Sequence, residues 1–213
     1  MQNQLSLATV IRCVLKPHHS LLRKEVERAA DLTGSAVLEQ RPPLCRILLP
    51  LHRLFREFRS DLDDHLDVQD ARLFPFLLEV ELALRAGEKP LHCADEISEA
   101  LRLLKHGQLS LASELDEMRE LTHGFIAPPD ACECYGELLD VLAGIQMEVA
   151  SEVRMEGSML SPHAAELMQR LRQWESDARD HNLESKRTRK GSPQDGHSPK
   201  PAAEASLVSC HSA

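Results

Sequence analysis

Apolar residues recur at alternating spacings of three and four along four long stretches of this chain, and that period is expected of helices with one buried face. Glycine and proline gather between the stretches, at residues 34–43, 86–90 and 122–129. The connections are short relative to the stretches, which favours antiparallel neighbours. The pattern predicts an all-α fold, an up-down four-helix bundle.

From residue 182 onward the periodicity ends, and the chain becomes rich in Pro, Gly, Ser and charged residues. Such a segment has too little apolar surface to offset the entropy of ordering. We therefore expect the bundle to occupy residues 1–181 and residues 182–213 to form a disordered C-terminal tail. The short basic run at residues 186–190 is interpreted as part of this solvated tail.

Composition and charge narrow the classes of partner. The formal net charge of -9 gives no positive field to attract nucleic acid or anionic lipid. No apolar run reaches the ~20 residues that span a membrane, and the N-terminal stretch lacks the features of a secretory signal. We expect a cytoplasmic protein that binds neither nucleic acid nor membranes, and the sequence indicates no particular protein partner.

Six cysteines are scattered along the chain, and only Cys132 and Cys134 are close in sequence. Their C-x-C spacing, without a second matching pair, supports neither a zinc site nor a disulfide framework, so partly buried thiols are expected. No nucleophile elbow or glycine-rich phosphate loop is present. We therefore name no catalytic residue.

The core-facing positions of the second and fourth stretches end in polar pairs. Both seams are apolar for about two turns and then place two polar side chains four residues apart, on one helical face. The second seam is Leu51, Phe55, Phe58, Leu62, His65 and Gln69. The fourth is Leu138, Leu142, Ile145, Val149, Glu152 and Glu156.

The other two stretches each place one histidine on the predicted seam. The first seam is Ala8, Ile11, Leu15, His19, Leu22, Val26 and Ala29. The third is Leu103, His106, Leu109 or Ser110, and Ser113. A buried carboxylate without a partner costs several kcal/mol, so two on one seam require compensation. A bound cation is the economical explanation.

A weak internal repeat relates the two polar pairs. His65-x3-Gln69-x3-Leu73-x-Pro75 has the same offsets as Glu152-x3-Glu156-x3-Leu160-x-Pro162. In an antiparallel bundle, such a repeat predicts a two-fold site with one pair supplied by each half.

Five segments carry a family resemblance: HHSLLRKEV (18–26), HLDVQDARLFP (65–75), the stretch around His106, PPDACECYGELL (128–139) and EVRMEGSMLSP (152–162). Together they resemble hemerythrin-like HHE cation-binding domains, and most closely the helical domain of bacterial iron-sulfur cluster repair proteins. The resemblance covers about residues 7–180, and the order of all five segments supports it better than any one motif. The small N-terminal Cys-Cys domain of the repair proteins is not expected here.

The resemblance implies a set of ligands. In that family, histidines hold two irons that two glutamates bridge. Carried over by position, the metal ligands are His19, His65, His106, Glu152 and Glu156, and the cofactor is non-haem iron, one or two ions.

Two positions depart from the family pattern. Gln69 replaces the glutamate of the first pair, and Glu152 replaces the histidine of the second. Asp70 follows His65 by five residues, about 140° around an ideal helix, so it can substitute only if the backbone shifts. The first pair is therefore expected to be the weaker half of the site.

Two functions follow from these expectations. The first is an iron protein that binds or senses oxygen or nitric oxide, a small diatomic ligand, or supports iron-sulfur cluster repair. The alternative is a metal-free degenerate bundle that acts as an interaction or scaffold module, with Glu156 paired to His19 or His106 as a buried salt bridge.

Overall fold

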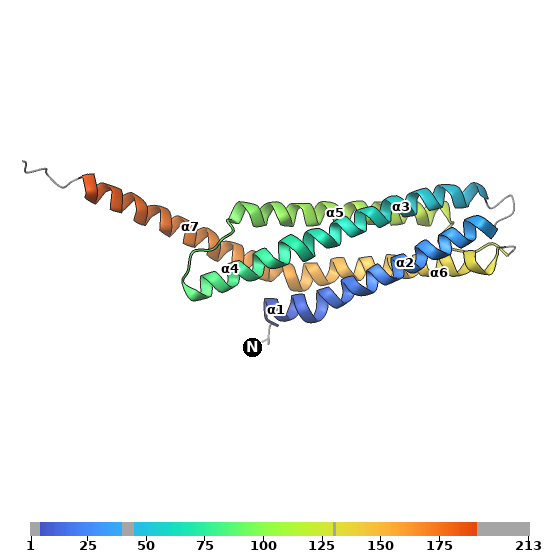
Figure 1. Ribbon diagram of the computed structural model, residues 1–213, viewed down its shortest axis with the longest axis horizontal. Coiled ribbons are helices and arrows are strands. Elements are labelled where there is room, and N and C mark those ends of the chain that lie inside the picture. The colour runs from blue at the N-terminus through green and yellow to red at the C-terminus, as the bar shows by residue number, and fades with distance from the viewer. Residues whose placement is uncertain (1–4, 40–44, 130, 191–213) are drawn as a thin grey trace, which may run out of the picture. The chain divides into compact units, whose positions relative to one another are not determined.

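A computed structural model of the chain describes residues 5–39, 45–129 and 131–190 (Figure 1). Within these ranges the structure is helical without a strand, and the helices join into four rods, which confirms the all-α bundle. The rods are α1 Leu7–Val10, η1 Ile11–Leu15 and α2 Lys16–Glu39; α3 Cys45–Val68, η2 Gln69–Leu73 and α4 Phe74–Ala86; α5 Ala94–Leu121; and α6 Glu133–Met155, η3 Glu156–Leu160 and α7 Ser161–Lys190. The η elements are π-helical turns.

The long helices enclose one interior. Helix α2 packs against α3 and α6, and α5 packs against the same two helices, so that the four lie side by side (Figure 1). Residues up to Trp174 form one compact unit, and Glu175 begins a second. No helix in the described part of the chain is both long and apolar enough to cross a membrane.

Two helix ends differ from the sequence prediction. Helix α2 continues through Gly34 to Glu39, because one glycine costs a helix only ~1 kcal/mol. Helix α7 continues to Lys190, into the segment predicted as a disordered tail. The sequence up to Lys190 holds neither glycine nor proline after Pro162, so nothing local ends the helix. Residues 191–213 of the predicted tail lie outside the described residues.

The predicted seams are confirmed on three rods, and the seam predicted for α5 is wrong. Every seam residue of the second and fourth stretches is buried, and on the first only Ala8 is less than buried. On α5, however, His106 and Leu109 are exposed. The buried positions there are Ala94, Ile97, Ala100, Leu104, Leu111, Leu115 and Met118.

A polar layer divides the apolar core in two. One cluster contains Leu22 and the later buried residues of α2, together with Phe55, Phe58, Leu115 and Leu142. The other contains Leu15, Leu73, Leu104, Leu160 and their neighbours. Along each rod the break between the clusters falls at the same level, at His19, at Gln69, at residues 107–108 and at Glu152 to Glu156.

Each of the three π-helical turns lies just before a proline. Each turn ends at a leucine followed two residues later by proline, at Pro17, Pro75 and Pro162. A proline inside a helix has no N–H to donate, and its ring clashes with the carbonyl four residues earlier. In each turn the residue before the proline donates its N–H five residues back, to the carbonyl of Ile11, Gln69 or Glu156. The wider turn accommodates the proline without ending the rod.

Candidate metal centre

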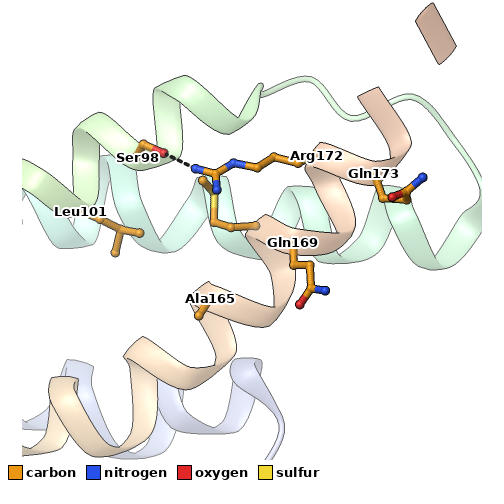
Figure 2. Close-up of a pocket in the computed structure, with 7 residues that line it drawn as sticks. Ser98, Leu101, Ala165, Gln169, Arg172 and Gln173 are labelled. Carbon is orange, nitrogen blue, oxygen red and sulfur yellow. Dashed lines mark hydrogen bonds between the residues drawn. The ribbon is translucent and has the colours of Figure 1, made fainter. Parts of the chain in front are cut away.

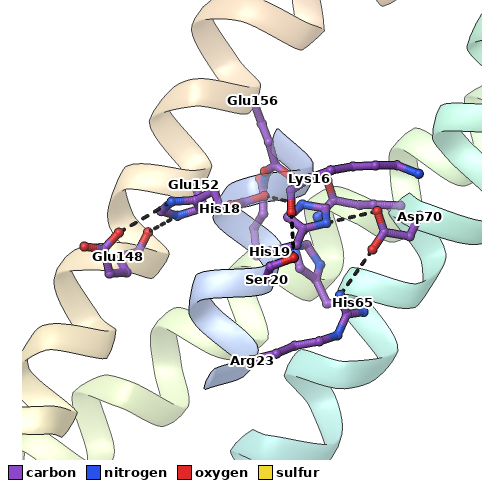
Figure 3. Close-up of polar contacts among 12 residues, drawn as sticks. Lys16, His18, His19, Ser20, Arg23, His65, Asp70, Glu148, Glu152 and Glu156 are labelled. Carbon is purple, nitrogen blue, oxygen red and sulfur yellow. Dashed lines mark hydrogen bonds and ion pairs between the residues drawn. The ribbon is translucent and has the colours of Figure 1, made fainter. Parts of the chain in front are cut away.

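The polar layer brings together four of the five predicted ligands (Figure 3). His19, His65, Glu152 and Glu156 are buried there, and so is Gln69. They come from α2, α3, η2, α6 and η3, so three of the four rods contribute. Gln69 and Glu156 are each the first residue of a π-helical turn.

His19 is held at both ring nitrogens. Its Nε2 lies 2.8 Å from Glu152 Oε1, and its Nδ1 lies 3.1 Å from Asp70 Oδ1. Arg23 in turn donates to Asp70 Oδ2 at 3.2 Å, and the His19 ring stacks on Phe74. Burial alone would lower the pKa of His19, but the hydrogen bond to Glu152 and the charges of Glu152 and Asp70 outweigh it and raise the pKa. A carboxylate oxygen thus faces each ring nitrogen of His19.

His18 adds a second imidazole to Glu152. Its Nε2 lies 3.2 Å from Glu152 Oε2 and 3.1 Å from the backbone oxygen of Glu148. Figure 3 shows the His18 ring beside both residues. Glu152 Oε2 is close enough to His18 Nε2 for an ion pair. It accepts no hydrogen bond with good geometry from the described residues. Glu152 is thus flanked by two consecutive histidines of α2.

Glu156 is buried beside Glu152 with less compensation. Gln108 of α5 donates to Glu156 Oε2, whereas Glu156 Oε1 has no hydrogen-bond partner within the described residues. Burial, followed by the charge of Glu152, raises the pKa of Glu156 to about 8. At neutral pH this carboxyl group is protonated, and a cation that binds it must displace the proton.

His65 and Gln69 form the neutral half of the layer. The Gln69 amide donates from Nε2 to His65 Nε2 at 3.0 Å, so that the ring proton lies on His65 Nδ1. Burial lowers the pKa of His65 to about 4, and the ring is neutral at pH 7. Gln69 Oε1 is buried and accepts no hydrogen bond from the described part of the chain.

Gly107 of α5 leaves the space that His65 occupies. A Cβ atom at position 107 would lie 2.5 Å from His65 Nδ1, a distance that real contacts do not reach. The ring cannot yield easily, because its other nitrogen is bonded to Gln69. Position 107 therefore requires glycine so long as His65 keeps this orientation.

His106 does not join the buried set. It is exposed on α5 and lines a surface pocket of about 230 Å3 whose wall includes His65 and Gly107. The predicted α5 seam is wrong by one position, because leucines at 101, 103, 104, 109 and 111 make two neighbouring registers look equally apolar. The register that buries Leu104 and Leu111 directs Gly107 and Gln108 to the layer.

The sequence prediction missed three contacts of the layer. It considered Asp70 only as a metal ligand, whereas Asp70 contacts His19. The shift of backbone that it required is present, because the π-helical turn begins at Gln69. Gln108 and Gly107 were missed with the register of α5, and a seam drawn through Leu104 and Leu111 would have found both.

The donor set can be tested for its fit to a metal. Within the described ranges, no group of three or more His, Cys, Asp or Glu side chains is arranged to hold an ion, because His19 and Glu152 point at one another. Chemically the set fits iron, which accepts imidazole nitrogen and carboxylate oxygen. Gln69 Oε1 and Glu156 Oε1, which lack hydrogen-bond partners among the described residues, would both be available to a cation once Glu156 loses its proton. Asp70 contacts His19 Nδ1. In many metal sites a carboxylate likewise accepts the hydrogen bond from the ring nitrogen that does not bind the metal.

Another pocket, of about 620 Å3, is lined from α5 and the first part of α7 (Figure 2). Its only charged side chain is Arg172, which lies 3.5 Å from the Ser98 hydroxyl. The pocket contains no group that could act as a base or bind a metal. Of these two regions, only the polar layer combines buried imidazole and carboxyl groups.

Comparison with known proteins gives a relationship at low identity. The iron-sulfur cluster repair protein ScdA of Staphylococcus haemolyticus is 24% identical over 156 residues, which cover 73% of this chain and 66% of that protein. The chain is similar to iron-sulfur cluster repair proteins. The ScdA proteins of two Staphylococcus epidermidis strains match to the same extent. The chain thus spans about two thirds of the length of these relatives, and no protein-family model matches it.

The comparison supports the predicted resemblance at the level of the repair proteins. The hemerythrin-like HHE assignment, the bound iron and the diatomic ligand are finer than this similarity and stay predictions.

Proposed function

We propose that this protein binds non-haem iron in its polar layer and supports iron-sulfur cluster repair. The observation that carries the proposal is the pair of buried acidic side chains, Glu152 and Glu156, each with one oxygen that accepts no hydrogen bond from the described residues, in a largely apolar core. The similarity to ScdA proteins supports the repair role. Whether one or two ions bind depends on Gln69.

Five side chains would hold the iron: His19, His65 and Glu152, with Glu156 and the Gln69 carbonyl oxygen. His19 and Glu152 would exchange their mutual contact for the cation, with loss of the proton from His19 Nε2, while Asp70 keeps the His19 ring in place. Glu156 gives up its proton. When bound, iron supplies an open coordination position for a small diatomic ligand, or an ion for delivery to a damaged cluster. Phe58, Leu62 and Val149 exclude bulk water from one side.

A second candidate function follows from the contacts that already satisfy much of the layer. His19 pairs with Glu152, Gln108 pairs with Glu156, and Gln69 pairs with His65. These contacts would make a metal-free bundle tenable as an interaction or scaffold module. The salt bridge foreseen for that case, from Glu156 to His19 or His106, is replaced by the His19 pair with Glu152.

Metal stoichiometry separates the two functions. The full chain is loaded with ferrous iron without oxygen, freed of loose metal, and analysed for iron per chain. We expect about one iron or less in the wild type, because Gln69 supplies a neutral amide to the second position. Gln69→Glu should move the stoichiometry toward two and add the spectroscopic signature of a bridged pair. Wild type without iron would favour the scaffold.

His106→Ala is the matched control. The exposed position of His106 predicts unchanged iron content, whereas the ligand set implied by the family resemblance predicts a loss.

For the repair role, the loaded protein is mixed with a purified enzyme whose iron-sulfur cluster has been damaged by peroxide. Recovery of that enzyme with wild type, but not with Glu156→Gln, is expected. Equal recovery with both proteins would contradict the proposal.

A further inference from the structure

Cys132 and Cys134 lie at the start of α6, about five turns before Glu152 of the polar layer on the same helix. Cys132 is the N-cap residue, with extended backbone, and the Tyr135 N–H donates to its Sγ at 3.4 Å. Cys134 follows in the first turn. The two sulfur atoms lie 2.8 Å apart. A disulfide bond is about 2.0 Å long, so less than one ångström separates the pair from bonding distance.

The surroundings fix both thiols in this arrangement. Each is half-buried and packs on the edge of the apolar cluster that includes Tyr135 and Leu138. Tyr135, the next residue after Cys134, is itself fully buried. The pair is therefore preorganised by the helix cap and the core, yet the sulfurs remain within reach of a small reagent.

We propose that Cys132 and Cys134 form a redox-active dithiol, which closes reversibly to an intramolecular disulfide by exchange with a low-molecular-weight disulfide such as glutathione disulfide. One thiolate attacks the reagent, releases the first reduced thiol and forms a mixed disulfide. The second thiolate then displaces the second reduced thiol. Two protons leave the cysteines and two thiols of the reagent gain them, while the cysteine pair is oxidised by two electrons.

The geometry indicates a labile bond and not a structural one. The ring would close over a single intervening residue, Glu133, so it removes little conformational entropy from the unfolded chain. Half-exposed disulfides in tight rings are the readily reduced class. We therefore expect oxidation to change the melting temperature little while changing the reactivity of this end of α6.

Cys93 provides a matched control within the same chain. It is also an N-cap cysteine, at the start of α5, where its own N–H is bonded to Glu96 at 2.9 Å. The residue two positions later is Asp95, so no second thiol can resolve a mixed disulfide there. Exposed Cys13 serves the same purpose in a π-helical turn.

The test uses the full chain without added metal, so that it is independent of iron binding. Reduced protein is equilibrated without oxygen in graded mixtures of glutathione and its disulfide, quenched with an alkylating reagent, digested and analysed by mass. The peptide containing residues 132–134 should lose the mass of two hydrogens in one reversible transition. Peptides containing Cys13 or Cys93 should instead gain a glutathione.

Variants define the outcomes further. Cys132→Ser and Cys134→Ser should each convert the remaining thiol to the glutathione adduct, and Cys93→Ser should leave the transition unchanged. The proposal is overturned if the wild-type pair forms adducts at both sulfurs, stays reduced in every mixture, or forms a disulfide with another cysteine.

Discussion

The His65–Gln69 pair and the Glu152–Glu156 pair have the same backbone and opposite chemistry. Each pair precedes a leucine and a proline at the same offsets, and in each the second residue opens a π-helical turn. Burial holds His65 neutral, with its pKa lowered to about 4, and raises the pKa of Glu156 to about 8. The backbone thus sets where a polar pair enters the core, and the side chains alone decide its charge.

A third copy of the repeat supports this separation. Leu7, Ile11, Leu15 and Pro17 have the same spacing, and η1 opens at Ile11 as the other two turns open at Gln69 and Glu156. Its residues are all apolar and belong to one core cluster. The π-helical turn therefore forms with or without polar residues before the proline, whereas Pro50 lies within α3 without such a turn.

The largest expected difference between the two pairs is in metal affinity. Glu156→Gln should weaken iron binding by more than ~100-fold, since it removes a direct charged ligand. Loss of a residue that only hydrogen-bonds to a ligand already costs up to ~100-fold in metal affinity. Gln69→Asn, the matched change in the neutral pair, should weaken it less than ~10-fold. Competition with a coloured chelator measures both, and circular dichroism checks that the variants are folded. Equal losses would contradict the assignment of the acidic pair as the stronger half.

The two pairs should also oppose one another in the pH dependence of stability, measured on chelator-treated protein. Glu156 has its pKa raised from 4.5 to about 8. As pH rises, the unfolded chain therefore loses this proton first. The free energy of unfolding falls by up to ~1.4 kcal/mol per pH unit as pH rises from 4.5 to about 8. His65 has its pKa lowered from 6.5 to about 4. It remains neutral in the fold while the unfolded chain gains a proton, and stability rises with pH between these values.

Denaturant unfolding of wild type and of each variant gives their stabilities at each pH. The difference between the two stabilities reports the titration of the substituted group, because the other groups titrate alike in both proteins. The wild-type stability minus that of Glu156→Gln should fall as pH rises from 5 to 8. The wild-type stability minus that of His65→Asn should rise from pH 4 to 6.5. A difference for Glu156→Gln that increases with pH would mean that the carboxyl group is charged in the fold.

Gly107→Ala tests the steric support of the neutral pair. The new Cβ would meet His65 Nδ1, so we expect a loss of ~1–3 kcal/mol in the free energy of unfolding, as for other overpacked cores. Gly144→Ala on α6 is the control, since nothing lies within 4 Å of the added atom. That substitution should stabilise the helix by ~0.5–1 kcal/mol. If both variants gained stability, His65 would not occupy the space beside position 107.

The smallest effect should be the same in both pairs. Pro75→Ala and Pro162→Ala each restore a backbone N–H in a rod whose π-helical turn already accommodates the proline. Stability should fall by only ~0.4–1 kcal/mol, because the unfolded chain gains conformational freedom. Thermal unfolding of the two variants measures this. Clearly unequal losses would show that the two backbones are not equivalent.

The sequence by itself determined the helices, the bundle and most of the polar layer. The seams ending at His65 and Gln69 and at Glu152 and Glu156 could be found because one apolar face dominates each of those stretches, and burial follows that face. The polar pairs stood out as exceptions on an otherwise apolar line. His19 was found in the same way.

Tertiary structure alone decided the rotation of α5 and the contacts that cross between rods. The leucines of α5 lie on two neighbouring faces of the helix, so its own sequence leaves two registers nearly equivalent. The volume of the His65 ring selects the register with Gly107 inward. That choice exposes His106 and brings Gln108 to Glu156. The Asp70 contact to His19 likewise depends on a backbone turn and a partner 51 residues away. Local periodicity has no information about either.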